Sequence, residues 1–259
     1  MTSYSNITVN RTGAFVTVTL DNPGKRNALS HAMLDDLLVA IDEIGRSDSL
    51  GVVLAANGPV FSAGHDFADV AGHDHASVRA LLRKCTALMV GLQELPQPVV
   101  ARVHALATAA GCQLVASCDL AVAAESAGFC LPGGKGGWFC HTPAVALARN
   151  VGRKRAMEMA LSGDVIDAAT AADWGLVNRV VPDAELDEAT TELLERVTRG
   201  SAESKGFGKQ AFYAQVDLDQ PKAYAYAIEA MAAASQLPDA AEGMAAFFGK
   251  RKPEWKRGR

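Results

Sequence analysis

The chain has 259 residues, which suits one large domain or a core with a smaller appendage. Hydrophobic residues make up 49% and charged residues 21%, a composition typical of globular proteins. The formal net charge of −4 argues against nucleic acid or an anionic membrane as a general partner, and the densest local basic patch is the C-terminal KRKPEWKRGR.

The chain begins with alternating strand and helix patterns. Residues 15–20 (FVTVTL) alternate apolar side chains with threonine, as a strand does. Ser30 is suited to cap a helix whose apolar face comprises Met33, Leu34, Leu37, Leu38, Ile41 and Ile44. A strand at 51–56, a helix at 77–95 and a strand at 98–106 follow, and prolines end that helix.

The alternation continues to Pro182. Thr142 followed by Pro143 is typical of an N-cap with proline at the first helical position. The predicted elements are a helix ending near 117, a strand at 119–124, helices at 143–150, 154–161 and 168–174, and a strand at 176–181. Beyond residue 182 the pattern is helical. We therefore predict an α/β core over residues 1–182, with parallel or mixed sheets, and a helical region over 183–259.

The cysteines and the N-terminal residues indicate the compartment. The chain contains five cysteines, an odd number without C-x2-C spacing, at Cys85, Cys112, Cys118, Cys130 and Cys140. This pattern indicates buried thiols in a reducing compartment. The segment MTSYSNITVN does not resemble a secretory signal, and no apolar run reaches the roughly 18 residues of a membrane span. We expect a cytoplasmic protein without a metal site or membrane span.

Two loops share a feature that matters for chemistry. Residues 62–66 (SAGHD) and 107–111 (ATAAG) each follow a strand and place small residues ahead of a helical segment. Backbone N–H groups at a helix start lack an intrahelical partner and carry the positive end of the helix dipole. Two such groups could hold one oxygen that develops negative charge, and each donor is typically worth about 3–4 kcal/mol. Small residues at helix starts are also common without such a role.

The order and spacing of several motifs resemble the enoyl-CoA hydratase/isomerase family, also called the crotonase superfamily. The motifs are NPGKRNALS, FSAGHDF, ALATAAGCQLVASCDLAVA, LSGDVIDAATAADWGLVNRVVP and GMAAFFGKRKPEW. The resemblance extends from about Phe15 to Trp255. It implies an α/β spiral of ββα units, with a helical C-terminal region that builds a homotrimer or hexamer. It also implies an acyl-CoA thioester as substrate, so that coenzyme A enters with the substrate and no separate cofactor is expected.

The resemblance also implies site residues. The oxyanion donors would be the N–H groups of His65 and Ala110. The residues implied to contact coenzyme A are Lys25 and Arg26 near its phosphates, Ala63 and Asp66 near its adenine and pantetheine, and Phe247, Lys250 and Lys256 from a neighbouring subunit.

The usual acid–base pair of this family is missing. In relatives that hydrate a double bond, one glutamate occupies the position of Gln113 and a second lies in a P-E step, which here is Pro132-Gly133. Neither glutamine nor glycine exchanges a proton near neutral pH. The resemblance therefore implies an oxyanion frame without the groups that support ordinary hydration.

Few side chains offer a replacement. His141 lies eight residues beyond Gly133, where some isomerase relatives place an aspartate, and histidine titrates near neutral pH. The alternative is that His141 precedes the Thr142 cap and bonds locally. Cys140 would be a nucleophile only if its pKa were lowered, and His65 could turn its imidazole towards the thioester although its backbone suffices.

Three interpretations of function follow from these residues. The first is a family enzyme acting on acyl-CoA, for which ordinary hydratase activity is doubtful. The second is a family enzyme of another reaction type, such as thioester hydrolysis, decarboxylation of a malonyl-type CoA, or isomerisation using His141. The third is an acyl-CoA-binding protein without catalysis. Because function depends on the site and not on the fold, residues 113, 133 and 141 discriminate between them.

Overall fold

The strands form two sheets in the computed structural model, which describes residues 3–255. The larger sheet has the order β1-β2-β3-β4-β6-β9 and the smaller one the order β5-β7-β8. In the larger sheet β1 and β2 are antiparallel, and every later neighbouring pair is parallel. The strands are β1 (Ile7–Thr12), β2 (Phe15–Leu20), β3 (Gly51–Ala56), β4 (Val99–Val103), β5 (Ala107–Thr108), β6 (Leu120–Ala124), β7 (Gly128–Cys130), β8 (Ile166–Asp167) and β9 (Arg179–Val181).

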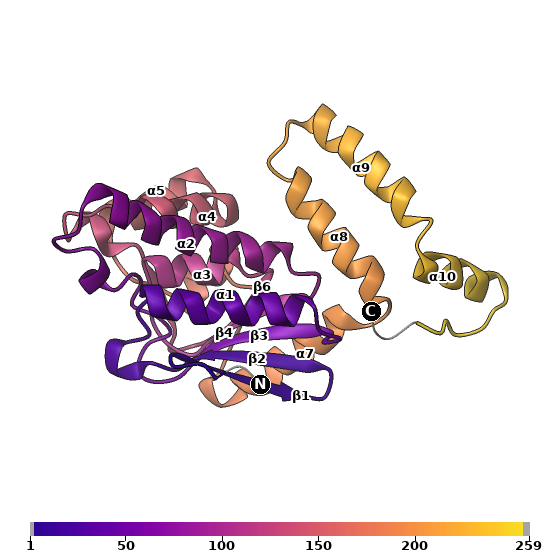
Figure 1. The fold of residues 1–259 in the computed structure, drawn as a ribbon, viewed down its shortest axis with the longest axis horizontal. Coiled ribbons are helices and arrows are strands. Elements are labelled where there is room, and N and C mark those ends of the chain that lie inside the picture. The colour runs from indigo at the N-terminus through magenta and orange to yellow at the C-terminus, as the bar shows by residue number, and fades with distance from the viewer. Residues whose placement is uncertain (1–2, 256–259) are drawn as a thin grey trace.

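Helices cover both faces of the larger sheet. They are α1 (His31–Gly45), α2 (His75–Glu94), α3 (Ala110–Ser117), α4 (His141–Val151), α5 (Arg153–Ser162), α6 (Ala168–Trp174), α7 (Leu186–Thr198), α8 (Ala202–Gln215), α9 (Gln220–Ala234) and α10 (Pro238–Phe248). Helices α1 and α2 lie on one side of the sheet and α7 on the other (Figure 1). In β3, Val52 and Leu54 belong to the main core with residues of α1 and α2, while Val53 and Ala55 cluster with residues of α7. This alternation follows the two-residue period of a strand and explains why β3 is apolar throughout.

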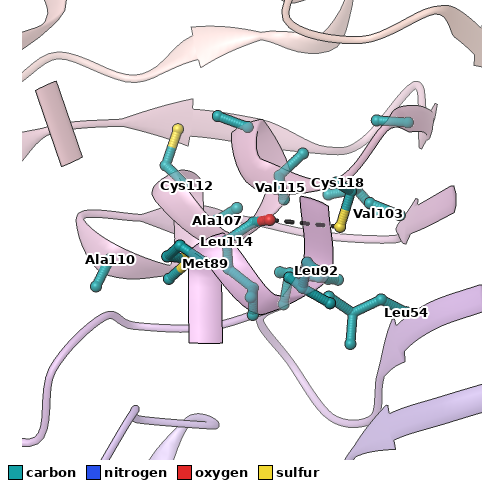
Figure 2. Packing of buried hydrophobic residues seen from close by; sticks show 14 of the residues in the cluster. Leu54, Met89, Leu92, Val103, Ala107, Ala110, Cys112, Leu114, Val115 and Cys118 are labelled. Carbon is teal, nitrogen blue, oxygen red and sulfur yellow. Dashed lines mark hydrogen bonds between the residues drawn. The ribbon is translucent and has the colours of Figure 1, made fainter. Parts of the chain in front are cut away.

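Helix α3 lies inside the main core. All of its residues are buried, and Leu114 lies among Leu92, Met89 and Leu54 (Figure 2). The Sγ atom of Cys118 donates to the carbonyl of Leu114 at 3.4 Å. Because no charged residue occurs in this helix, its burial carries no desolvation cost for an ionised side chain. The core thereby fixes the start of α3, where the segment 107–111 with its small residues lies.

The last three helices extend from one side of the core (Figure 1). Helix α8 packs on α2, and Lys209 of α8 forms an ion pair with Asp119 at 2.6 Å. Helix α9 folds back along α8, and its long apolar side chains are exposed. No helix within residues 3–255 has the combination of length and hydropathy that a bilayer crossing requires.

Most predicted elements are confirmed, and the differences have physical causes. Strand β1 was missed because its second half, NRT, is exposed and polar, and β7 and β8 are too short to show a period. The predicted cap at Thr142 is wrong, because α4 begins at His141 and no side chain caps it. The boundary between residues 182 and 183 stays a prediction.

Candidate active site

The loop after β3 lies against the start of α3 through backbone hydrogen bonds. The N–H of Thr108 donates to the carbonyl of Ser62 at 3.0 Å, and the N–H of Ala63 donates to the carbonyl of Arg26 at 3.0 Å. The buried side chain of Asn27 donates to the carbonyl of Asn57 at 2.7 Å, which fixes the first loop in the same place. Three segments that are distant in sequence are thereby joined at one end of the sheet.

Glycine permits the closest approach between these segments. Gly64 has φ +86°, and a Cβ atom there would lie 3.1 Å from the amide nitrogen of Ala110 and 2.9 Å from the Cβ of Ala109. A Cβ at Gly111 would lie 2.5 Å from the carbonyl oxygen of Ser62. Ala109 itself has φ 51°, a backbone conformation that a residue with a side chain rarely adopts. The junction is therefore close-packed and holds local strain.

Two N–H groups at this junction are free to bind a ligand. Ala110 is the first residue of α3, so its N–H has no intrahelical partner. Among residues 3–255, neither this N–H nor that of His65 donates a hydrogen bond to another protein atom. The family resemblance had implied these two residues as the oxyanion donors, and that role stays a prediction.

A cavity of about 290 Å³ opens beside them. It is lined by Ala63, His65, Phe67, Leu82, Thr108, Ala109, Ala110, Pro132, Gly133, Gly136, Trp138, Phe139, Cys140, His141, Thr142 and Pro143. Six of the residues weighed for chemistry in the sequence, namely Ala63, His65, Ala110, Gly133, Cys140 and His141, are thus brought together. None of the described residues that line this cavity carries a carboxylate.

An aromatic wall was missed by the sequence reasoning. Trp138 lies edge-to-face with Phe67 at 6.2 Å between ring centroids and 6.1 Å from the ring of His65. Phe139 lies 5.1 Å from the ring of His141. These rings come from η2 (Phe67–Asp69) and from the segment after η3 (Pro132–Gly134). The available signal was a tryptophan directly after the glycine-rich run GGKGG.

Gln113 lies one turn into α3 and not on the cavity wall. Its side chain is 5% exposed, and its Oε1 atom has no hydrogen-bond partner among the described residues. Its carbonyl accepts from the Oγ of Ser117 at 2.8 Å. A neutral amide tolerates this burial better than an unpaired carboxylate would.

Gly133 is required by packing. A Cβ atom there would lie 2.2 Å from the carbonyl oxygen of Trp138 and 2.8 Å from the Sγ of Cys140. The carbonyl of Gly133 accepts from the N–H of Trp138 at 2.9 Å, which closes the loop on itself. Any side chain at this position requires the loop to move.

His141 and Cys140 differ in reactivity and exposure. His141 is exposed on the first turn of α4, and its ring faces Phe139. Burial raises the pKa of the Cys140 thiol, and a backbone hydrogen bond from Gly133 offsets this only in part. A raised pKa leaves little thiolate near neutral pH, so the nucleophilic alternative for Cys140 has no support.

An ion pair links the loop that carries Lys25 and Arg26 to the loop after β3. The Nζ of Lys25 lies 3.0 Å from the Oδ2 of Asp66, whose Oδ1 accepts from the N–H of Ala68 at 3.0 Å. The hydrogen bond from the N–H of Ala68 is the main cause that lowers the pKa of Asp66, and Lys25 lowers it further. Arg26 is exposed and has a left-handed backbone, with φ 51°.

The predicted contacts from the C-terminal region lie elsewhere in the chain. Phe247 is the penultimate residue of α10 and is 78% exposed, and Lys250 is exposed just beyond that helix. Phe247 lies on one of the helices that extend away from the core, and Lys250 follows that helix (Figure 1). Lys256 lies outside the described residues.

The cysteines are buried and carry free thiols. Within residues 3–255, no group of three or more His, Cys, Asp or Glu side chains is arranged to hold a metal ion.

Comparison with known proteins finds relatives that cover nearly the whole chain. The sequence profile described as enoyl-CoA hydratase/isomerase matches residues 10–258. Enoyl-CoA hydratase domain-containing protein 3, mitochondrial, from Homo sapiens is 45% identical over 243 residues, which cover 92% of this chain and 79% of the human protein. The Rattus norvegicus protein of the same name is 43% identical, with 92% and 80% covered.

Solved structures extend the comparison to the fold. An enoyl-CoA hydratase from Mycobacterium smegmatis has a TM-score of 0.92 and 44% identity, covering 97% of this chain and 99% of the other. Human enoyl Coenzyme A hydratase domain-containing protein 3 has a TM-score of 0.91 and 41% identity, covering 97% and 100%. The predicted α/β fold with a helical C-terminal region is confirmed.

The expectation of a cytoplasmic protein is wrong. Relatives from rat, mouse and human carry the word mitochondrial in their names. The expectation had rested on the N-terminal residues and on unpaired cysteines, and neither feature is specific to one compartment.

Proposed function

Since the chain belongs to the enoyl-CoA hydratase/isomerase family, we propose that it binds an acyl-CoA thioester and stabilises negative charge on the thioester oxygen. The oxygen lies between the N–H groups of His65 and Ala110. The observation that carries this proposal is the pair of unbonded N–H groups at the wall of a 290 Å³ cavity.

The electrostatic contribution of this arrangement is large. Each positioned donor is typically worth about 3–4 kcal/mol when charge develops on the oxygen. The donor at Ala110 also lies at the positive end of the α3 dipole, which is worth about 0.3–1 kcal/mol or more in a partly buried site. Both an enolate and a tetrahedral oxyanion would be stabilised in this way.

Coenzyme A is held outside the acyl cavity. Ala63 lines the cavity, and Lys25, Arg26 and Asp66 lie on the two loops joined beside it. The ion pair between Lys25 and Asp66 positions a cation that can meet a phosphate. Phe247 and Lys250 would reach the ligand from a neighbouring copy of the chain.

Ordinary hydration of an enoyl-CoA is expected to be very weak. Hydrating relatives use glutamates at the positions of Gln113 and Gly133, and each acid–base group typically contributes about 10²–10⁴-fold. The reaction types that remain are those in which charge stabilisation on the thioester oxygen supplies most of the catalysis. They are thioester hydrolysis, decarboxylation and isomerisation, and His141 lines the cavity as one candidate acid–base group.

The proposal is tested by measuring butyryl-CoA binding and crotonyl-CoA hydration on the same preparation. We expect binding with hydration close to background. Gln113→Glu alone should leave hydration close to background, because residue 113 is buried away from the cavity wall and the second glutamate position is a glycine. Gly133→Glu is not informative, since the backbone of Trp138 occupies that space.

Each outcome has a distinct meaning. Robust hydration by the wild type would show that the acid–base pair has been misplaced. Failure to bind butyryl-CoA would contradict the function itself, while binding without turnover of any thioester would identify an acyl-CoA-binding protein.

A further inference from the structure

The imidazole of His65 is only weakly held by the residues that surround it. His65 lines the cavity, yet both its ring nitrogens are shielded from solvent and neither makes a hydrogen bond of standard geometry within residues 3–255, although the backbone of Leu29 acts on the ring and favours its protonated form. The nearest ring belongs to Trp138, at 6.1 Å between centroids. Buried polar atoms are nearly always paired, so an unpaired imidazole beside a ligand cavity calls for an explanation.

The backbone already accounts for one role of this residue but not for its side chain. The N–H group of His65 would serve the oxyanion equally well with alanine at this position. A side chain attached to the residue that binds the thioester oxygen starts close to the thioester carbon and its neighbouring Cα. A half-turn of the imidazole about its Cβ–Cγ bond exchanges the places of ring nitrogens and ring carbons, and this torsion is soft for histidine.

We infer that the imidazole of His65 moves the proton at Cα of the bound acyl group, while the N–H of the same residue holds the thioester oxygen. This inference rests on the proposed function, because it requires an acyl-CoA in the cavity. One residue would then supply two functions. Its N–H group would be an oxyanion donor, and its imidazole would be the base, a function that the family resemblance assigns to carboxylates.

Other ionisable groups at the cavity fit this task less well. Within residues 3–255, those that line it are His65, His141 and Cys140. The thiol of Cys140 has a raised pKa because of burial. His141 is exposed on the first turn of α4, and its ring lies against that of Phe139. It belongs to neither of the two loops that carry His65 and Ala110.

The charge state of His65 suits a base. Burial lowers its pKa below the ordinary 6.5, and the backbone of Leu29 and the carboxylate of Asp69 oppose this shift only in part. The remaining ionisable neighbours at the cavity are His141 and Cys140, while the Lys25–Asp66 ion pair lies on the adjoining loops. The imidazole is therefore mostly neutral at pH 7 and can accept a proton.

The step balances without a further reactant. The Cα–H bond breaks and the proton passes to an imidazole nitrogen, which becomes imidazolium. The bonding electrons form the C=C bond of the enolate, and the carbonyl electrons move onto the oxygen held by His65 and Ala110. Return of the proton restores the thioester, and in D2O a deuteron returns when the imidazolium has exchanged its proton with solvent before the return.

Deuterium incorporation at C2 of butyryl-CoA in D2O, followed by mass spectrometry, tests this step directly. The wild type should incorporate deuterium. His65→Ala, which keeps the N–H donor, should lose at least about 10²-fold in rate while its Kd for butyryl-CoA changes little. His65→Gln, which keeps polarity and bulk but cannot titrate, should behave as His65→Ala does. His73→Ala removes an exposed histidine outside the cavity and serves as the control.

The pH profile separates a proton-transfer role from a structural one. Wild-type exchange should fall as pH drops below the lowered pKa of His65, because the imidazolium cannot accept a proton. Exchange retained in His65→Ala, or exchange lost in His141→Ala alone, would overturn the inference. Binding by the wild type without exchange would overturn it too, and would leave the binding proposal standing. Absence of binding would refute both.

Discussion

His65 and Ala110 contribute to the site through backbone atoms, so their N–H positions depend on neighbours that allow a close approach. Gly64 lies against Ala110 with φ +86°, and Gly111 lies against the carbonyl of Ser62. The strained backbone of Ala109, with φ 51°, belongs to the same junction. Strain held at such a point is a common feature of preorganised sites.

Replacing Gly64 tests how strictly this junction positions the donors. Gly64→Ala adds a methyl group 3.1 Å from the nitrogen of Ala110. We expect a loss of about 1–3 kcal/mol in stability and, by displacing one donor, of roughly 10²-fold in thioester turnover. Thermal unfolding and turnover of whichever thioester proves active measure the two effects.

Gly72→Ala is the matched control for backbone strain. Gly72 also has a positive φ, +78°, but no atom lies within 4 Å of its added Cβ. It should lose stability and keep its activity. Equal losses of activity in the two variants would mean that strain, not donor position, limits the site.

Part of the site could be read from the sequence, and part could not. Small residues before helical segments predicted the loops of His65 and Ala110, because this signal depends only on residues that are neighbours in the sequence. The aromatic wall of Trp138 and Phe67 could not be predicted, since it depends on how the segment after η3 folds back over η2. The need for glycine at residue 133 likewise comes from the carbonyl of Trp138.

At the scale of elements, α8 is attached to the core by a buried ionic contact. The Nζ of Lys209 lies 2.6 Å from the Oδ2 of Asp119, and it donates to the carbonyls of Leu92 at 2.8 Å and Gln97 at 2.9 Å. The same Oδ2 of Asp119 accepts from the N–H of Val99 at 2.7 Å. The two side chains are only 10% and 15% exposed, and their hydrogen bonds offset much of the desolvation cost.

Breaking this contact from one side should destabilise the protein strongly. Lys209→Met leaves the Asp119 carboxylate buried without its counter-charge, which typically costs about 3–5 kcal/mol. Arg149→Met removes the exposed pair with Asp217 and should cost about 0–1 kcal/mol. Denaturant unfolding of both variants provides the comparison. A cost below about 1 kcal/mol for Lys209→Met would mean that α8 does not depend on the pair.

Element boundaries were predictable where a local signal exists. Ser30 caps α1 and Asp167 caps α6, and in each case the side-chain oxygen accepts from the N–H three residues on. Thr142 has the same chemistry but lies inside α4, because the chain already turns helical at His141. Strand β7 pairs with β5 and β8, and these short strands depend on that pairing. No residue pattern within β7 or β8 could therefore predict them.

On the scale of the whole molecule, the C-terminal helices carry apolar surface that one copy of the chain does not bury. Met231 is 80%, Phe247 78% and Phe248 81% exposed, and Ile228 and Tyr224 of α9 are exposed as well. Apolar side chains gathered in this way mark an interaction surface. The family resemblance had implied that this region builds a trimer or hexamer.

We predict that light scattering at micromolar concentration gives a mass of three or six times the 27.2 kDa chain. Met231→Glu places a charge on the exposed apolar face and should shift the distribution towards smaller species. Glu229→Gln changes an exposed polar residue on the same helix and should have no effect. A monodisperse wild-type species of one chain mass would refute the prediction.

The most direct test of the central claim is a crystal structure of the protein with butyryl-CoA bound. We predict that the acyl group lies in the cavity beside Trp138 and His141, with the thioester oxygen about 3 Å from the nitrogens of both His65 and Ala110. A thioester oxygen more than about 5 Å from either nitrogen, beyond any hydrogen-bonding distance, would contradict it.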